Sequence, residues 1–547
     1  MRIIVVGGVA GGMSAATRLR RLDESADIIV IERSGYVSYA NCGLPYFVGG
    51  VIEDEDDLLL QTPESLHERF RLDVRVLSEV IGVDADQRLV SVRSVDTNEA
   101  YELTYDYLIL SPGATPVVPP LPGIERALPL RTVEDVEVLA GRVESTPQSA
   151  VVIGGGFIGI ELAENLRHRN IPVTLVEATS QVMAPLDPEM ATLVADELER
   201  HGVRVMLNSS VAEVTSTGVL LSTGEAVDGE LVILAIGVRP DTRLAQAAGV
   251  AIGARGGIAV DQFNRTTDPH IYAIGDAAEK IDAFDGGASL VPLANIANRH
   301  GRTVADHIMG LEVAPASTIG TAIVKVFDVT VAATGMNEKR ATAQGRNFRV
   351  IHTHPKSHAG YYPGATSMAL KLIVDAETDA ILGAQGVGFD GVDKRIDVIA
   401  TALKAGLCAS ELAELELAYA PPYGSAKDPI NMLGYIADNL RQGLVTTIQW
   451  NEIDERRNEG YELVDVRTPG EFAKGSIPGA RNIPVDNLRE HLDGLRGTRV
   501  VVYCQVGQRG HTAARLLADE GVAVVNLDGG YATWHKSPAR FNSEVLV

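Results

Sequence analysis

The sequence is poor in cysteine, aromatic residues and long apolar runs. Its three cysteines, Cys42, Cys408 and Cys504, stand far apart in 547 residues, which excludes a disulfide framework and a cysteine-based zinc cluster. No apolar stretch approaches the roughly 18 residues that a membrane-spanning helix needs. Met1 is followed by a short apolar strand and not by a signal peptide. We therefore expect a cytoplasmic protein without a membrane span.

Positive charge is also scarce. The formal net charge is −24 at pH 7, whereas nucleic-acid binding needs clustered Lys and Arg to displace counterions from phosphates. We therefore expect no nucleic-acid partner, and any phosphate group of a ligand has to be bound locally. The chain is longer than the roughly 250 to 300 residues at which a single hydrophobic core stops growing, so several domains are expected.

A glycine-rich turn follows the first apolar segment. Residues 3–6 are apolar, residues 7–12 are rich in glycine, and a second apolar segment ends at Glu32. Glycines let a backbone approach a pyrophosphate at a helix N-terminus, and an acidic residue about 20 positions later binds a ribose. The pattern predicts a Rossmann unit, although Val9 stands at the middle glycine position.

The pattern occurs a second time with all three glycines present. Residues 151–153 are apolar, residues 154–159 contain the glycines, and the next apolar segment ends at Glu177. Two such units predict two bound dinucleotides. Ala178 follows Glu177 in place of a basic residue, and a carboxylate there repels a 2′-phosphate, so NADH is favoured over NADPH.

Two further apolar strands, residues 107–110 and 271–274, end in turns at Pro112-Gly113 and at Asp276. The order of these two strands and the two glycine-rich motifs along the chain resembles that of the pyridine nucleotide-disulfide oxidoreductases. The resemblance implies an α/β chain with two Rossmann-like domains, for FAD and for NAD, followed by an α+β dimerisation domain. The expected boundaries are 1–112 and 262–319 for FAD, 113–261 for NAD(P)H, 320–437 for dimerisation and 438–447 for a linker.

In this family the residue at Asp276 binds the ribityl chain of the flavin, Phe157 gates the nicotinamide pocket and Glu161 lies beside it. The resemblance implies cofactor contacts at Gly7, Gly8, Ala10, Gly11, Gly12, Glu32, Arg33, Asn41, Pro112, Gly113, Gly154, Gly156, Phe157, Ile158, Gly159, Glu161, Glu177, Gly237, Asp276, Pro292, Leu293 and Ala294.

Cys42 lies in the segment Ser-Tyr-Ala-Asn-Cys-Gly-Leu-Pro-Tyr, shortly after Glu32. A helix beginning at Gly43, as in the family, would favour the thiolate, which is the form that attacks a disulfide or persulfide. No second cysteine follows at Phe47, so Cys42 has no internal disulfide partner. It alternates between thiolate and a mixed disulfide, or between thiolate and sulfenic acid.

The Cys42 segment resembles the coenzyme A disulfide reductases within this family, and Ala10 stands where the oxidase branch usually has His. Coenzyme A is then implied as a substrate or as a tightly bound cofactor. Arg18 and Arg21 lie three residues apart on the first predicted helix and suit its phosphates. The other expected contacts with coenzyme A are Ser14, Ser38, Asn41 and Lys427.

Two tyrosine-containing segments, residues 360–365 and 419–429, carry the same resemblance. It implies that Tyr361 and Tyr419 reach across a homodimer to the catalytic cysteine, where a phenol can donate a proton to a leaving thiolate. The choice between Tyr361 and Tyr362 stays open. His352, His354 and His358 lack accompanying acidic or cysteine ligands, so no metal site is predicted.

Residues 448–547 resemble a rhodanese domain, on the segments 463–467, 477–480, 504–509 and 527–531. Cys504 ends a predicted strand and begins a loop into a helix. Such a loop directs backbone N–H groups at the sulfur and Arg509 adds positive charge, so that thiolate and persulfide are both stabilised.

Together these features predict NADH-dependent reduction of persulfide, polysulfide or coenzyme A persulfide at Cys42, with coenzyme A disulfide as a secondary substrate. Cys504 would deliver sulfane sulfur, and Cys408 is expected in the core. Two alternatives remain. One is an NADH oxidase or peroxidase with a Cys42 sulfenic acid, and the other is a sulfurtransferase or sulfur-relay carrier centred on Cys504.

Overall fold

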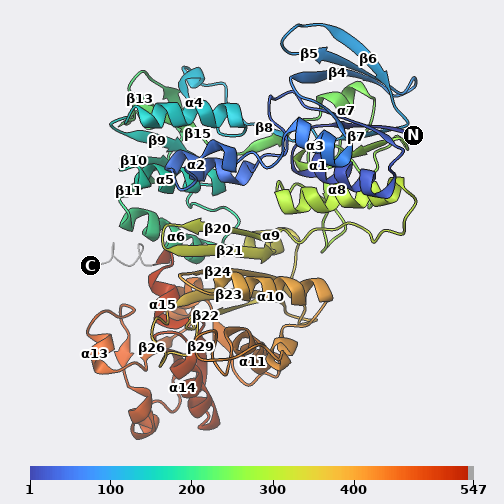
Figure 1. Cartoon of the computed structure of the whole chain (residues 1–547). Helices are drawn as coiled ribbons and strands as arrows, with labels where there is room; N and C mark the ends of the chain where they lie inside the picture. Colours follow the sequence, from blue (N-terminus) through green and yellow to red (C-terminus); the bar gives the residue numbers. More distant parts are fainter. Residues whose placement is uncertain (540–547) are drawn as a thin grey trace. The chain divides into compact units, whose positions relative to one another are not determined.

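The computed structural model describes residues 1–539, which form two units. The first unit comprises Met1–Ser180 and Gly202–Ile319, and the second comprises Gln181–His201 and the chain from Gly320 onward. Figure 1 labels their elements. Residues 540–547 of the expected rhodanese segment lie outside the described residues. No helix within residues 1–539 is long and apolar enough to cross a bilayer.

A five-stranded parallel sheet forms around the first apolar segment. Ile3, Ile4 and Val5 are fully buried because both faces of the sheet are covered, as is usual for parallel strands. The strand order is β17-β7-β1-β2-β3. The strands are β1 (Arg2–Val6), β2 (Asp27–Ile31), β3 (Asp73–Arg75), β7 (Tyr107–Leu110) and β17 (Ile271–Ala273), and the helices beside them are α1 (Ala10–Leu22), α3 (Pro63–Phe70) and α8 (Ala294–Ile308). The short helix α2 (Leu44–Gly49) packs instead against helices of the second parallel sheet.

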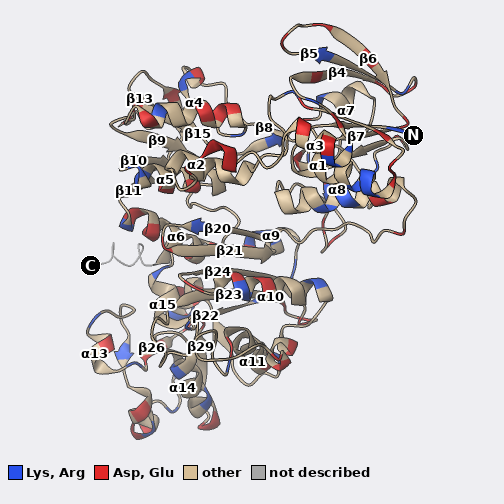
Figure 2. Ribbon diagram, viewed as in Figure 1, with Lys and Arg blue, Asp and Glu red and all other residues tan. Residues whose placement is uncertain are grey.

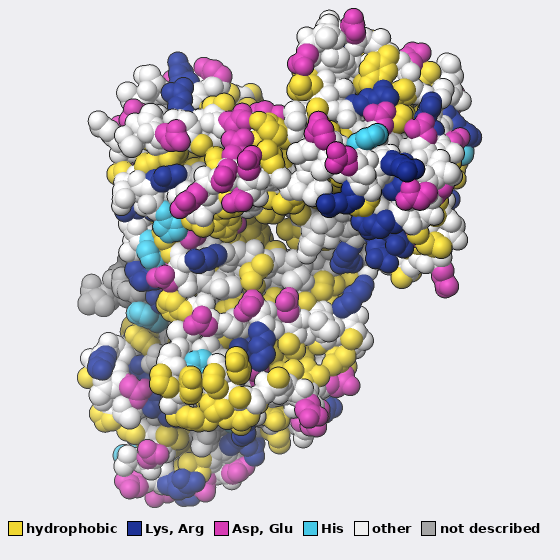
Figure 3. Space-filling view, in the orientation of Figure 1, with side chains coloured by type: hydrophobic (Ala, Val, Ile, Leu, Met, Phe, Trp, Pro, Cys, Tyr) yellow, Lys and Arg dark blue, Asp and Glu magenta, His cyan; other side chains and the backbone are white. Residues whose placement is uncertain are grey.

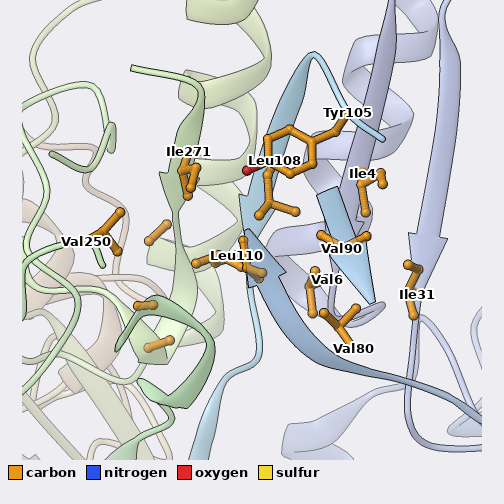
Figure 4. Packing of buried hydrophobic residues seen from close by; sticks show 14 of the residues in the cluster. Ile4, Val6, Ile31, Val80, Val90, Tyr105, Leu108, Leu110, Val250 and Ile271 are labelled. Atoms are coloured by element: carbon orange, nitrogen blue, oxygen red, sulfur yellow. The ribbon is translucent and has the colours of Figure 1, made fainter. Parts of the chain in front are cut away.

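The two faces of this sheet have different covers. Alternate residues such as Ile3 and Val5 pack against α1 and α8. Ile4 and Val6 point the other way, toward Val80 and Val90 of an antiparallel three-stranded sheet, and Figure 4 shows this packing. The covering strands are β4 (Ser78–Asp84), β5 (Leu89–Ser94) and β6 (Ala100–Thr104).

The second glycine motif begins another parallel sheet, with strand order β11-β10-β9-β15. Its elements are β9 (Ala150–Ile153), β10 (Val173–Val176), β11 (Val203–Met206), β15 (Leu231–Leu234), α4 (Val133–Glu144) and α5 (Phe157–His168). Shorter elements are β8 (Ala114–Pro116), β12 (Val211–Val214), β13 (Gly218–Leu221), β14 (Ala226–Asp228), β16 (Val238–Pro240), β18 (Lys280–Ile281), β19 (Ala288–Ser289) and α7 (Arg243–Ala247).

Helix α6 (Pro188–Arg200) belongs to the second unit, although it lies between β10 and β11 in the sequence. The main sheet of that unit is antiparallel, in the order β20-β21-β24-β23-β22. Its elements are β20 (Ala322–Val326), β21 (Val329–Gly335), β22 (Phe348–Thr353), β23 (Met368–Asp375), β24 (Ile381–Gly388), α9 (Glu338–Ala343), α10 (Val392–Ala405) and α11 (Pro429–Arg441). Helix α11 thus continues into the segment expected to be a linker.

The last part of the second unit has its own parallel sheet, in the order β25-β29-β28-β26-β27. Its elements are β25 (Thr447–Ile448), β26 (Tyr461–Asp465), β27 (Arg481–Asn482), β28 (Arg499–Tyr503), β29 (Ala523–Leu527), α12 (Ile453–Asn458), α13 (Pro469–Phe472), α14 (Gln508–Asp519) and α15 (Gly530–His535). The expected α/β fold class, with two Rossmann-like sheets, an α+β part and a small α/β part, is confirmed.

The glycines of both motifs permit close backbone contacts. Gly7 and Gly154 adopt φ angles of +100° and +109°, a region that residues with a Cβ rarely occupy. A Cβ on Gly12 would lie 1.9 Å from the carbonyl oxygen of Gly7, and one on Gly159 would lie 2.0 Å from that of Gly154. Each helix therefore packs directly on its own turn.

The substitution Gly159→Ala tests this contact. The added methyl group overlaps backbone that cannot move aside, so we expect the free energy of unfolding to fall by about 1–3 kcal/mol or more. Gly141→Ala is the matched control in α4, because a Cβ there meets nothing within 4 Å and should stabilise the helix by roughly 0.5–1 kcal/mol. Urea unfolding followed by circular dichroism measures both, and equal stability of the two variants would contradict the contact.

Candidate functional site

A cavity of about 910 Å³ lies at the carboxyl ends of the first sheet's strands. Ligands of open α/β sheets bind at such an edge. Of the residues expected to contact FAD, those on its wall are Gly7, Ala10, Gly11, Glu32, Arg33, Asn41, Pro112, Gly113, Asp276, Pro292 and Ala294. Gly8, Gly12 and Leu293 are close in the chain but do not line it. We call this space the nucleotide cavity.

Glu32 fixes the first glycine turn. Its carboxylate accepts the backbone N–H of Gly8 at 2.7 Å and that of Ser34 at 2.9 Å. Burial raises the pKa of Glu32 although these hydrogen bonds lower it. The carboxylate therefore joins the turn to the end of β2, at the place where a ribose-binding acid is expected.

Asp276 also lines the nucleotide cavity, and residues that the sequence did not indicate hold it in place. Arg131 donates to its carboxylate at 2.7 Å, and both side chains line the nucleotide cavity. Lys280 donates to the carbonyl oxygens of Gly275 and Ala278 and so fixes the turn that carries Asp276. Burial lowers the pKa of Lys280 to about 8. Neither Arg131 nor Lys280 belongs to a recognisable motif.

The second glycine turn has the same construction. Glu177 accepts the backbone N–H of Gly155 at 2.7 Å, and the N–H and hydroxyl of Thr179 donate to its other oxygen at 2.8 Å each. The structure thus places a fixed carboxylate beside the second turn. The remaining predicted residues of this site are Gly154, Gly156, Phe157, Ile158 and Gly159, in the turn and the start of α5, and Gly237, in the segment between β15 and β16.

Cys42 lies on the wall of the nucleotide cavity and also on the wall of a second pocket of about 500 Å³. Its side chain is exposed. It follows Asn41 in a short 3-10 turn that leads into α2. Desolvation and the Glu161 carboxylate raise the pKa of the Cys42 thiol, and Arg131 lowers it. The helix expected after Cys42 is present as α2, but in the protein alone desolvation and Glu161 disfavour the thiolate.

The second pocket contains many of the residues expected to contact coenzyme A. Ser14, Arg21, Ser38 and Asn41 line it, and Gln61, Arg69 and Asn298 join them. Figure 2 shows Lys and Arg residues on α1 and α8. Arg18 is not on the wall, since it pairs with Asp306 of α8 at 2.6 Å.

Glu161 and Tyr46 form a polar pair near Cys42. The Tyr46 hydroxyl donates to Glu161 at 3.3 Å. Burial raises the pKa of Glu161 to about 7, and Glu161 is one of the charges that raise the pKa of Cys42. A carboxyl group that titrates near neutral pH can take up or release a proton close to the thiol.

Within the second unit, Tyr361 and Tyr419 lie together. Their hydroxyl oxygens are 3.1 Å apart, and this hydrogen bond raises the pKa of Tyr361. The side chains are 77% and 48% exposed, which leaves both phenols available to a partner molecule. Lys427 is also exposed.

Cys504 follows β28 and is fully buried. Arg509 forms two hydrogen bonds with Glu471, at 2.6 and 2.8 Å, and Cys504 is among the groups that raise the pKa of Arg509. The guanidinium is therefore beside the sulfur, but Glu471 offsets part of its charge. Cys408, expected in the core, is only half-buried.

The three histidines of the second unit's sheet region have separate partners. His352 binds Asp528 and Glu189, His354 binds Thr533 at 2.8 Å, and His358 interacts with the carbonyl oxygen of Ala359. The expectation that no acidic group accompanies these histidines is therefore wrong for His352, which lies between two carboxylates.

Three family profiles match this chain. Residues 1–301 match the pyridine nucleotide-disulphide oxidoreductases, residues 321–428 match the dimerisation domain of that family, and residues 449–537 match the rhodanese-like domain. A coenzyme A disulfide reductase of Staphylococcus haemolyticus is 35% identical over 441 residues, which are 80% of this chain and all of the relative.

Two solved structures are similar over almost the whole length. The reduced CoADR-RHD of Bacillus anthracis is 48% identical, with a TM-score of 0.96 over 98% of both chains. The NAD-dependent persulfide reductase from A. fulgidus is 37% identical, with a TM-score of 0.92 over 98% of this chain and 100% of that chain.

The substitution Glu161→Gln tests the electrostatic link to Cys42. With a pKa of about 7, Glu161 is mostly neutral below that pH and charged above it. The variant should therefore react faster than the wild type with iodoacetamide at Cys42 above pH 7, and nearly equally below about pH 6. Mass spectrometry measures the rates, and Glu144→Gln on the exposed face of α4 is the control. Identical pH profiles for all three proteins would contradict the link.

Proposed function

Because this chain belongs to the pyridine nucleotide-disulphide oxidoreductase family, we propose that it is an FAD-dependent reductase that uses NADH to cleave sulfur–sulfur bonds at Cys42. The position of Cys42 carries the proposal. Its thiol lies on the wall of the nucleotide cavity and of the second pocket, so one sulfur atom can exchange electrons on one side and bind a sulfur substrate on the other.

The nucleotide cavity fits FAD. The turn at Gly7 is bare backbone at a helix N-terminus, which suits a pyrophosphate, and a Cβ on Gly11 would crowd Ser111 and Ile274 at 3.2 Å. Glu32 would bind the ribose and Asp276 the ribityl chain. FAD, when bound, accepts a hydride from NADH and supplies the electron pair that returns Cys42 to a thiolate.

The second glycine turn would hold NADH. Glu177 already accepts hydrogen bonds from Gly155 and Thr179, so its carboxylate is fixed where the adenosine ribose of the nucleotide would lie. A negative charge there accepts hydrogen bonds from ribose hydroxyls and repels a 2′-phosphate. NADH is therefore preferred over NADPH.

The second pocket would bind coenzyme A, as substrate or as a retained cofactor. Arg21 and Arg69 offer guanidinium groups to its phosphates, and Ser14 and Asn298 offer further polar contacts. The pantetheine thiol would then reach Cys42 at the inner wall. Arg18 would contribute only indirectly, because it is paired with Asp306.

The chemistry at Cys42 follows from the lack of a partner cysteine. The Cys42 thiolate attacks the inner sulfur of coenzyme A persulfide, a bond forms between Cys42 and coenzyme A, and hydrosulfide leaves. Coenzyme A disulfide would give the same mixed disulfide and release coenzyme A thiolate. In both cases an electron pair supplied through the flavin would then break the bond between Cys42 and coenzyme A, which leaves as its thiolate. Glu161 is suited to hold a proton near these thiolates, because it titrates at about pH 7.

The fused rhodanese-like domain favours persulfide over plain disulfide. Cys504 stands at the end of a strand with Arg509 beside it, an arrangement that stabilises a persulfide anion. Carrying sulfane sulfur has no use in disulfide reduction, but it supplies persulfide to a reductase. Cys504 would therefore deliver sulfur to coenzyme A or to Cys42.

The dimerisation-domain match, at residues 321–428, supports a homodimer. Phe389, Tyr361 and Tyr423 are among its large hydrophobic residues that are exposed in one chain, and Figure 3 shows hydrophobic side chains gathered on the face of the second unit near α11. Contiguous exposed apolar groups typically mark an interface. In the dimer, Tyr361 and Tyr419 would face the partner's catalytic cysteine.

A panel of electron acceptors tests the reaction. Anaerobic oxidation of NADH should be fastest with coenzyme A persulfide or polysulfide, slower with coenzyme A disulfide and slowest with oxygen when that is added. Turnover of oxygen alone would refute the proposal.

Cys42→Ser should lower every sulfur-dependent rate by about three orders of magnitude or more, whereas Cys504→Ser should impair only substrates whose sulfur has to be delivered. Full persulfide reduction by Cys42→Ser would contradict the scheme.

The variants Tyr361→Phe and Tyr419→Phe test the phenols. Loss of a proton donor should lower kcat for coenzyme A disulfide by about a hundredfold, while flavin reduction by NADH in stopped-flow absorbance stays unchanged. Tyr435→Phe, at a tyrosine that is 40% exposed on α11, is the control. If all three variants keep the wild-type kcat, the tyrosines have no catalytic role.

A further inference from the structure

Strand β22 lies at the edge of the antiparallel sheet, and the rhodanese-like part covers that edge. Edge strands normally leave backbone donors and acceptors unpaired. Here the backbone N–H of His352 donates to the Asp528 carboxylate at 2.8 Å, and the carbonyl oxygen of Val350 accepts from the side chain of Gln449 at 3.0 Å. The edge is thus closed by side chains and not by another strand.

The His352 ring bridges two carboxylates. Its Nδ1 lies 2.7 Å from Asp528 and its Nε2 lies 3.0 Å from Glu189 on α6. The exposed fraction of each of the three side chains is 5% or less. Ionised carboxylates only accept hydrogen bonds, so both ring nitrogens have to donate and the ring carries a positive charge. Burial alone would lower the pKa of His352, but these hydrogen bonds raise it to about 9.

The charges around His352 favour its protonated, positively charged form. Lys371 is the register partner of His352 on β23 and contacts three carboxylates, one of them Asp187 at 2.9 Å. His354, on the other side, has its pKa lowered to about 3 by burial and by His352, so it stays neutral. The Trp450 ring also donates to Glu189, at 3.3 Å. The carboxylates that face the two cations are Asp187, Glu189, Glu338 and Asp528.

Asp528 in turn leads into the segment that supports the Cys504 loop. Tyr531 donates its backbone N–H to the carbonyl oxygen of Cys504 at 2.8 Å, and Ala532 donates to that of Gln505 at 2.9 Å. Gly530 approaches so closely that a Cβ would lie 2.4 Å from the Cys504 carbonyl oxygen. Displacing Asp528 therefore displaces the support of the loop.

We propose that His352 is a positioning residue for sulfur transfer at Cys504. Its imidazolium links Glu189 to Asp528 and holds Gly529 and the first turn of α15, and with them the Cys504 loop, in one conformation. Glu189 lies on α6, which belongs to the second unit together with His352 and Asp528, so the whole bridge lies within that unit. The inference rests on the proposed role of Cys504.

His352→Gln in the full-length holoenzyme tests this role, because Gln keeps one donor but loses the charge. Losing a hydrogen bond to a charged partner should let the loop open more often, so alkylation of Cys504 by iodoacetamide should be about tenfold faster. Sulfur transfer from thiosulfate to cyanide should fall by about tenfold or more. Cys42 and Cys408, read in the same digest, should keep their alkylation rates.

The pH dependence separates positioning from simple loss of structure. A raised histidine pKa gives stabilisation that is fully present below the unfolded pKa and is lost as pH rises through the folded value. The variant-to-wild-type ratio of Cys504 alkylation should therefore be largest below about pH 7 and approach one above about pH 10. Because the Cys504 thiol ionises in both proteins, its own ionisation cancels in the ratio of the two alkylation rates.

Two further variants complete the experiment. Asp528→Asn keeps an acceptor for the backbone N–H of His352 but removes the charge, so it should reproduce the effect of His352→Gln. His491→Gln, at an exposed histidine of the rhodanese-like part, should change nothing. Reduction of coenzyme A disulfide through Cys42 should stay within about twofold in every variant, because the bridge supports only the Cys504 loop.

The outcomes are distinct. A wild-type chain that transfers no sulfur would overturn the proposed role of Cys504 and the positioning role with it. Normal alkylation and transfer in both bridge variants would overturn the positioning role alone. Equal loss of the Cys42 activity, or a ratio that does not change with pH, would show that His352 serves only general folding and would overturn it as well.

Discussion

A single thiol that carries out two exchanges has to be reachable from two sides. Cys42 meets this constraint because it lines both the nucleotide cavity and the second pocket. The first sheet lines the nucleotide cavity, through the turn after β1, and α1 and α3 line much of the second pocket. The rest of the first unit orients these elements around one sulfur atom.

The electrostatic environment of the Cys42 thiol lowers the fraction that is thiolate and so lowers its reactivity. Desolvation and Glu161 hold the pKa of Cys42 above its usual value, whereas the positive charge of Arg131 lowers it. In the proposed enzyme, ligands with their own charges replace water on both sides of the sulfur. The protein therefore supplies the geometry of the reaction, and the state of the thiol depends on what is bound beside it.

The local parts of this arrangement could be predicted from the sequence. The strand, glycine turn and acidic residue of each Rossmann unit are continuous patterns, and the structure places Glu32 and Glu177 in matching hydrogen bonds. Long-range pairs left no such pattern. Arg131 forms an ion pair with Asp276. The spacing of Arg18 and Arg21 also did not reveal that Arg18 forms an ion pair with Asp306.

The same limit applies to burial. The sign of the pKa shift at Cys42 depends on desolvation, which follows from packing and not from the short helix after it. The charge of His352 depends on carboxylates that lie far away in the sequence, at Glu189 and Asp528. Sequence spacing suggested only that these histidines do not form a metal site.

The position of helix α6 in the sequence affects how the chain folds during its synthesis. Met190, Val194 and Leu198 are buried, yet α6 is grouped with residues that begin at Gly320. At a synthesis rate of roughly 5–20 residues per second, about 120 residues and 6–24 seconds separate the helix from the start of its partner. During that interval the apolar face of α6 lacks its final cover, because the strands β20 and β24 that it contacts have not yet been synthesised.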